Sequence, residues 1–95
     1  MERCHYHYHV DVFCRTNDGR AHFIRQSKAL PKRVAKREFD LVVQEFRMQV
    51  GKFQVRPARD ADRETAFPGA IKIAENHRLI IVLSRCDCGG DRNEM

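Results

Sequence analysis

The segment with the clearest chemical potential is CHYHYHVDVFC, residues 4–14, which places three histidines at alternating positions between two cysteines. In a β-strand, residues two apart point to the same side, and their Cα atoms lie about 7 Å apart. His5, His7 and His9 would therefore share one face of a strand. Two of these imidazoles could reach one Zn²⁺ ion if a neighbouring strand supplied further ligands.

Cys86 and Cys88, near the other end of the chain, could supply thiolates. If the first and last strands are antiparallel neighbours, Cys4 approaches both, and His5 or His7 completes a four-ligand set. The spacing argues against this site, because structural zinc sites typically use cysteine pairs about two to four residues apart. The histidines also fall on the strand face opposite Cys4. We therefore assign no metal ligand and no cofactor, and a small zinc-stabilised domain stays an alternative.

No motif in the chain indicates catalysis. The sequence has no recognisable spacing for a nucleophile beside a base, for paired carboxylates or for a glycine-rich phosphate loop. The first predicted hairpin places Cys14 opposite His22, but a thiol and an imidazole without a pocket are more typical of packing. We expect the protein not to be an enzyme.

Length and composition indicate one ordinary globular domain over residues 1–95, with 42% hydrophobic and 33% charged residues. The longest apolar run, residues 79–83, is far too short to cross a bilayer, and the N-terminus lacks an apolar signal segment. We expect a cytoplasmic protein with no membrane partner. Its four cysteines are expected to be reduced thiols or metal ligands rather than a disulfide framework.

The net charge of +5 is concentrated in the first third of the chain. Residues 1–37 contain nine lysines and arginines against three acids, and five of these bases lie within residues 28–37. Such a cluster attracts phosphates or an acidic protein surface. The alternative is that it forms only the solvated start of a helix.

Alternating apolar residues predict a strand over residues 4–14 and a second strand over residues 20–26. The turn formers between them include Gly19, which can adopt a positive φ, so the two strands should form a hairpin. We prefer the register that pairs aromatic with aromatic and apolar with apolar side chains, because a slip of one residue would expose one strand's core face. This register pairs Phe13 with Phe23, Val12 with Ile24, and Asp11 with Arg25.

One long helix is predicted over residues 32–50, because Pro31 suits a first helical turn and Gly51 a helix end. One side of this helix is apolar and should cover a sheet. A second apolar line lies on a separate flank, where it could pack under the following loop or meet a partner. The first side comprises Ala35, Phe39, Val42, Val43, Phe46 and Val50, and the second line comprises Val34, Leu41 and Met48.

Residues 52–69 are mostly charged and are predicted to form a surface loop, with at most a short extra strand at its start. Two further strands should follow, joined by a two-residue turn of Asn76 and His77. The last strand is apolar on both sides and should be central in the sheet or covered by another chain. Residues 89–95 are expected to form a flexible tail.

The predicted fold class is therefore α+β, with a four-stranded, largely antiparallel sheet, one helix on one face, and the order ββαββ. One helix covers only one face, and the other face would expose enough apolar surface to form an interaction site. The alternative is that residues 52–69 fold over that face. We expect the helix to cover Val10, Val12, Ile24, Ile71, Ile73, Ile80 and Val82, and the uncovered face to present Phe13, Phe23, Leu79, Ile81 and Leu83.

These features predict a small non-enzymatic interaction protein, an adaptor or an inhibitor, that binds a protein or nucleoprotein with an acidic surface. The basic helix start would steer association, and the apolar sheet face would hold the partner or a second copy in a homodimer. The alternative is nucleic-acid binding, which the pI near 9.3 and the aromatic first strand favour. The partner-binding bases are Lys32, Arg33, Lys36 and Arg37.

Overall fold

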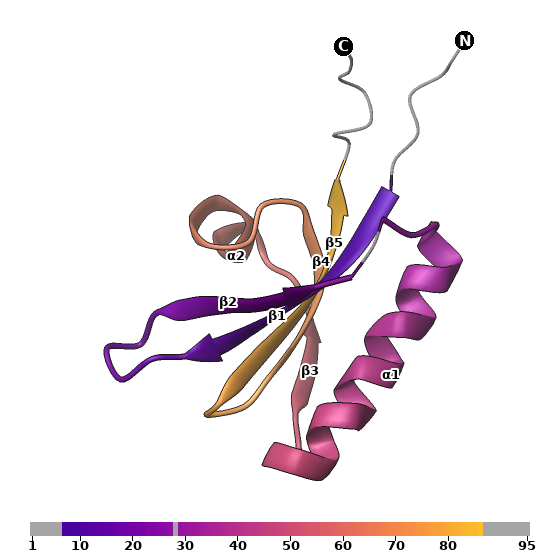
Figure 1. Cartoon of the computed structure of the whole chain (residues 1–95). Coiled ribbons are helices and arrows are strands. Elements are labelled where there is room, and N and C mark those ends of the chain that lie inside the picture. The colour runs from indigo at the N-terminus through magenta and orange to yellow at the C-terminus, as the bar shows by residue number, and fades with distance from the viewer. Residues whose placement is uncertain (1–6, 28, 87–95) are drawn as a thin grey trace, which may run out of the picture.

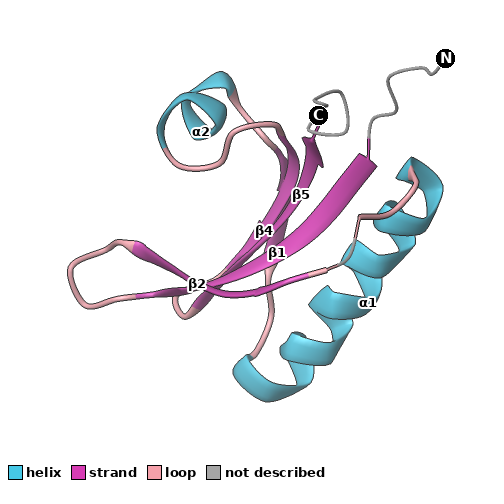
Figure 2. Ribbon diagram, turned by 45° about the horizontal axis from the view of Figure 1, so that its top comes forward, coloured by secondary structure: helices cyan, strands magenta, loops and turns pink. Residues whose placement is uncertain are grey.

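The computed structural model describes residues 7–27 and 29–86, which form an α+β fold with one five-stranded antiparallel sheet (Figure 1). Its elements are β1 (His7–Arg15), β2 (Ala21–Gln26), α1 (Lys32–Val50), β3 (Gln54–Pro57), α2 (Asp60–Thr65), β4 (Ala70–Glu75) and β5 (Leu79–Cys86). The strand order is β2-β1-β5-β4-β3. The two helices lie on opposite sides of the sheet (Figures 1 and 2). The predicted α+β class with an antiparallel sheet is confirmed, but the element order is ββαβαββ rather than ββαββ.

The sheet has five strands rather than four, and the prediction of a surface loop over residues 52–69 is wrong. Within that segment β3 pairs with β4, and α2 follows it. The sequence contains only a weak sign of β3, a short extra strand at the start of the segment, because β3 is a short edge strand with mostly exposed side chains.

The central position of β5 is confirmed, because it pairs with β1 on one side and β4 on the other. Its first six residues are all buried. An apolar run without alternation is typical of a strand that is covered on both faces.

The two faces of β5 are reversed relative to the prediction. Val10 pairs with Leu83 and Val12 with Ile81, and paired residues share a face of the sheet. Ile81 and Leu83 therefore lie under α1 in the main core. The sequence could not decide this point, because both faces of β5 are equally apolar.

The face away from α1 is covered by the chain itself, so the prediction of an uncovered apolar face is wrong. Ile73, Ile80 and Val82 form a second core there rather than lying under α1. Ala58 and Phe67, on either side of α2, pack against this core. Ala58 and Phe67 are too far apart in the sequence to form an apolar periodicity typical of a helix or a strand. The sequence therefore predicts a loop over residues 52–69.

The predicted helix over residues 32–50 is confirmed residue by residue. Gly51 ends it with φ 97°, a conformation that favours glycine, and its N–H donates to the Arg47 carbonyl. Pro31 precedes the helix as its N-cap instead of lying in the first turn. The buried side of α1 consists of Ala35, Phe39 and Val42, as predicted.

The β1–β2 hairpin follows the predicted register only near its turn. Phe13 pairs with Phe23 and Cys14 with His22, as expected. A bulge between Val12 and Phe13 then shifts the register by one residue, so Val12 lies opposite Arg25. The predicted pairing of Val12 with Ile24 is wrong, and Ile24 is half exposed rather than covered by α1.

Arg25 makes the shifted register favourable, because its side chain reaches α1. Its guanidinium carbon lies 5.3 Å from the centre of the Phe46 ring, and Nη2 lies 3.5 Å from a Glu45 oxygen. A cation over an aromatic face is attractive even where it is partly exposed. The bulge thus exchanges an apolar cross-strand pair for a contact between the edge strand and the helix.

The turn between β4 and β5 is longer than the predicted two residues, because Glu75 pairs with Ile80. Asn76 organises this turn: its Oδ1 accepts hydrogen bonds from the N–H groups of Arg78 at 2.8 Å and Leu79 at 2.9 Å. An asparagine side chain can replace a backbone carbonyl in this way.

Arg56 on β3 fastens α2 to the sheet. Its guanidinium donates two hydrogen bonds to Asp62, at 2.8 and 3.1 Å, and a third to Glu75 at 2.8 Å. The Arg59 N–H donates to the same Asp62 carboxylate at 2.8 Å. These hydrogen bonds lower the pKa of Asp62 to about 2, and those from Arg56 have the largest effect.

Replacing Asp62 by asparagine should lower the free energy of unfolding by about 1–3 kcal/mol at neutral pH, because Arg56 loses a charged, two-point partner. In the wild type this contribution is complete above the ordinary aspartate pKa of 3.8 and disappears as the pH falls through about 2. Urea unfolding of both proteins at several pH values measures the difference, which should shrink in acid. Asp60→Asn is the control, since Asp60 is largely exposed and should contribute below about 1 kcal/mol.

Candidate functional site

The most reactive group of side chains lies where the start of β1 meets the end of β5, on the face away from α1. His7 pairs with Cys86, and His9 pairs with Ser84, so these four residues share one face. His7, His9 and Cys86 are all half buried. The antiparallel pairing of the two strands thus joins a histidine pair from one end of the chain to a thiol from the other.

These three residues meet the basic geometry of a metal site. One nitrogen from each of His7 and His9 and the sulfur of Cys86 lie within 4.8 Å of one another. In a tetrahedral zinc site, bonds of about 2.0–2.3 Å separate the ligand atoms by about 3.3–3.6 Å. The imidazole rings are perpendicular, at 89°, with centres 5.4 Å apart. Small side-chain rotations would therefore bring the three atoms onto one ion.

His9 is oriented by a backbone contact of the kind that metal ligands use. Its Nδ1 lies 3.3 Å from the Ser27 carbonyl oxygen. Ser27 is itself held on β1, because its Oγ accepts the Val10 N–H at 2.9 Å and its own N–H donates to the Val10 carbonyl. In the tautomer with the proton on Nδ1, the other nitrogen of His9 is left as an acceptor for a cation.

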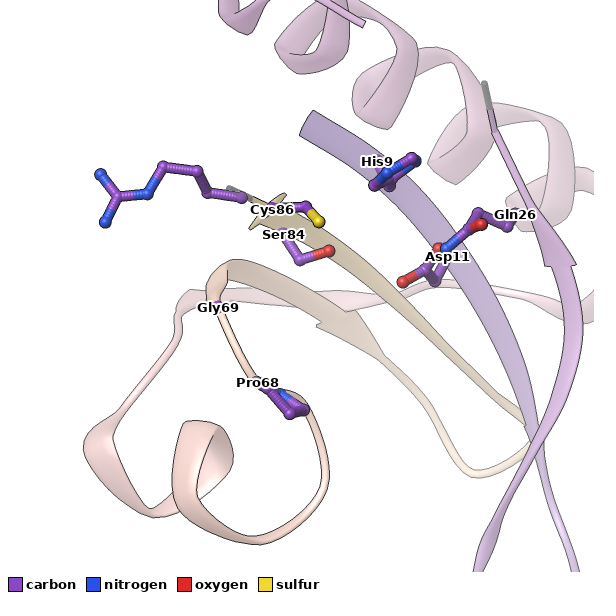
Figure 3. Close-up of a pocket in the computed structure, with 8 residues that line it drawn as sticks. His9, Asp11, Gln26, Pro68, Gly69, Ser84 and Cys86 are labelled. Atoms are coloured by element: carbon purple, nitrogen blue, oxygen red, sulfur yellow. The ribbon is translucent and has the colours of Figure 1, made fainter. Parts of the chain in front are cut away.

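Beside this group lies an open depression of about 630 Å³ that His9, Asp11, Ser84 and Cys86 border (Figure 3). Burial raises the pKa of the Asp11 carboxyl, and hydrogen bonding to Gln26 opposes this effect only in part. Within the described residues, Asp11 Oδ1 is buried and accepts no hydrogen bond. The depression is therefore polar, with a carboxyl group in its wall.

The turn before β4 forms the far rim of this depression through Pro68 and Gly69 (Figure 3). Gly69 has φ 77°, and its carbonyl accepts the Arg85 N–H at 2.9 Å. A Cβ atom at Gly69 would lie 2.3 Å from the Arg85 carbonyl oxygen. The turn therefore contacts β5 at Arg85, the residue before Cys86.

The bases predicted to bind a partner are all exposed in the first two turns of α1, on the opposite side of the sheet from Cys86. Their position in consecutive turns of one helix gives the cluster of bases that the sequence predicts. They are Lys32, Arg33, Lys36 and Arg37.

The predicted sheet-face contacts are mostly wrong. Leu79, Ile81 and Leu83 are buried, with exposed fractions of 8%, 0% and 1%, because β5 is the central strand. Phe23 is 52% exposed on the edge strand. Phe13 is half buried between the rings of Phe23 and Phe67. Only Phe23 of this set is available as an exposed aromatic contact.

The zinc alternative weighed from the sequence overlaps only partly with the observed group. Cys4, His5 and Cys88 lie outside the described residues. The sequence suggests two imidazoles of this ladder with a thiolate from Cys86 or Cys88, but the four-ligand set predicted from it uses Cys4 and only His5 or His7, and cysteine spacing and the opposite facing of Cys4 argue against it. The missing information was the register between β1 and β5, which places His7 opposite Cys86.

Comparison of the chain with protein-family models, curated proteins and solved structures finds no significant match. No helix within residues 7–27 and 29–86 has the length and apolar character needed to span a membrane.

Proposed function

We propose that this chain is a small non-enzymatic interaction protein, an adaptor or an inhibitor, that binds an acidic protein surface through the start and outer side of α1. The observation that carries the proposal is a row of exposed apolar side chains on this helix. Val34, Leu41 and Met48 are 44%, 54% and 91% exposed, and none of them belongs to either core cluster of the described residues.

Single exposed apolar residues are normal, but residues at seven-residue intervals lie on the same side of a helix, so these three define one apolar strip along α1. Arg37 borders this strip, three residues after Val34 and four before Leu41. Glu38 and Glu45 border its other side, and Glu45 is engaged by Arg25. The strip therefore offers apolar contact with a positive margin at its start, which suits a partner that is apolar at the centre and acidic at one end.

The basic start of α1 is unfavourable for the helix itself, which supports a role in binding. The first turn reads KRVA, without an acidic residue, although the N-terminus of a helix carries a partial positive charge. The side chain of Pro31 at the N-cap has no acceptor atom for the N–H groups of the first turn, and no side-chain cap is formed. Bases here oppose the helix dipole and do not stabilise the helix, which supports a role in attracting a negatively charged partner.

Reversing Lys36 and Arg37 to glutamate should reduce recovery of the partner about tenfold or more and should flatten the salt dependence of association. The measurement is affinity capture from the native host with quantitative mass spectrometry, followed by association kinetics on the protein recovered. Leu41→Ser should instead accelerate dissociation, because it removes apolar contact.

The matched control reverses Lys52 and Arg78, two exposed bases outside α1, and should retain the partner. Equal losses for both double variants would show that net charge alone matters and would overturn the assigned surface. If the α1 variants lose affinity for random oligonucleotides and no protein is recovered, the alternative of nucleic-acid binding replaces this proposal.

A further inference from the structure

We infer that His7, His9 and Cys86 form a Zn²⁺ site that links the start of β1 to the end of β5. This inference goes beyond the proposed function, since the three residues lie on the face of the sheet opposite α1. It rests on the convergence of one atom from each side chain within 4.8 Å.

The donor set selects the class of metal. Two imidazoles and a thiolate are borderline to soft ligands, which suit zinc and do not suit calcium or magnesium. Residues 7–27 and 29–86 supply three ligands for a four-coordinate ion, and the adjoining depression gives the fourth position access to water or to a small ligand.

Strand geometry preorganises the site. His7 and His9 are alternate residues on one face of β1, and Cys86 lies directly across from His7 on β5. The Ser27 carbonyl is within reach of His9 Nδ1, which directs the other ring nitrogen outward as in sites where a second contact orients the ligand.

The test uses the full chain with reduced thiols. Zn²⁺ is titrated in competition with a coloured chelator, and Co²⁺ serves as an optical probe. We expect one ion to bind at this group per chain, with release of the Cys86 proton, and the Co²⁺ form should show a thiolate charge-transfer band in the near ultraviolet. The melting temperature should rise with Zn²⁺ concentration.

Cys86→Ser and His9→Gln should each weaken zinc binding by more than about 100-fold, because even the loss of an outer contact to a ligand costs about 10–100-fold. Cys86→Ser should also abolish the charge-transfer band. Two separate variants are used so that a folding defect in one of them does not decide the result. Circular dichroism checks that each variant is folded. Cys14→Ser and His22→Gln are the matched controls, since these residues face each other on β1 and β2 outside the site.

Retention of wild-type affinity and of the band in Cys86→Ser and His9→Gln would place any bound zinc elsewhere and would overturn the inference. Failure of the wild type to bind Zn²⁺ would overturn it as well. Neither result affects the proposed function, whose variants lie on α1.

Discussion

Replacing Phe39 by alanine should lower the free energy of unfolding by about 3–5 kcal/mol, because it deletes a large, fully buried side chain. Phe39 lies at the centre of the contact between α1 and the sheet, and Lys72 Nζ lies 5.4 Å from its ring centre. A domain of this size has about 5–15 kcal/mol of stability in total, so the variant should be close to unfolding at 37 °C. Urea or thermal unfolding of the purified protein measures the loss.

Leu41→Ala is the natural comparison, because Leu41 lies two residues away on the same helix but is exposed. This change should alter stability by no more than about 0.5 kcal/mol. A large loss for Leu41→Ala would mean that the outer side of α1 is covered by the chain itself, and the proposed binding strip would then be wrong. Similar small losses for both variants would contradict the assignment of the buried side of α1.

Replacing Gly69 by alanine should cost about 2–4 kcal/mol, from two causes that act together. The backbone at Gly69 has φ 77°, which a residue with a Cβ atom adopts only with strain. The new atom would also lie 2.3 Å from the Arg85 carbonyl oxygen, so the turn must move away from β5. Thermal unfolding measures the loss of stability, and hydrogen exchange of the Arg85 amide should become faster.

Gly19→Ala separates the two causes. Gly19 has a similar φ of 86°, but no atom lies within 4 Å of the position of an added Cβ. Its substitution should cost only the conformational strain, about 1–2 kcal/mol. If both variants lose the same stability, the turn before β4 does not contact β5 as closely as the structure shows.

The two proposed surfaces lie on opposite sides of one sheet and can be tested independently. Helix α1, which carries the strip and its basic start, lies on one side of the sheet (Figure 2). The group around Cys86 lies on the opposite face, because Cys86 pairs with His7 while the alternate residues of β1 pack under α1. Tyr8, Val10 and Val12 pack under α1 while His7 and His9 point the other way, so β1 serves both surfaces. Zinc binding could stiffen β1 without touching the partner surface.

Local signals in the sequence were sufficient for the elements whose ends and faces depend on nearby residues. The long helix follows from its 3.6-residue periodicity, with Pro31 before it and Gly51 after it. The central position of β5 follows from its unbroken apolar run, because a strand covered on both faces needs no polar side. The exposure of the bases at the start of α1 follows from the same periodicity.

Tertiary structure alone decided which face of each strand meets the helix. Alternation divides a strand into two faces but does not say which neighbour each face meets, and for β5 both faces are apolar. The pairing of Val12 with Ile81 settled this question, and it also brought Cys86 to His7. Such contacts join residues that are far apart in the chain, so their register depends on the packing of the whole sheet rather than on any local pattern.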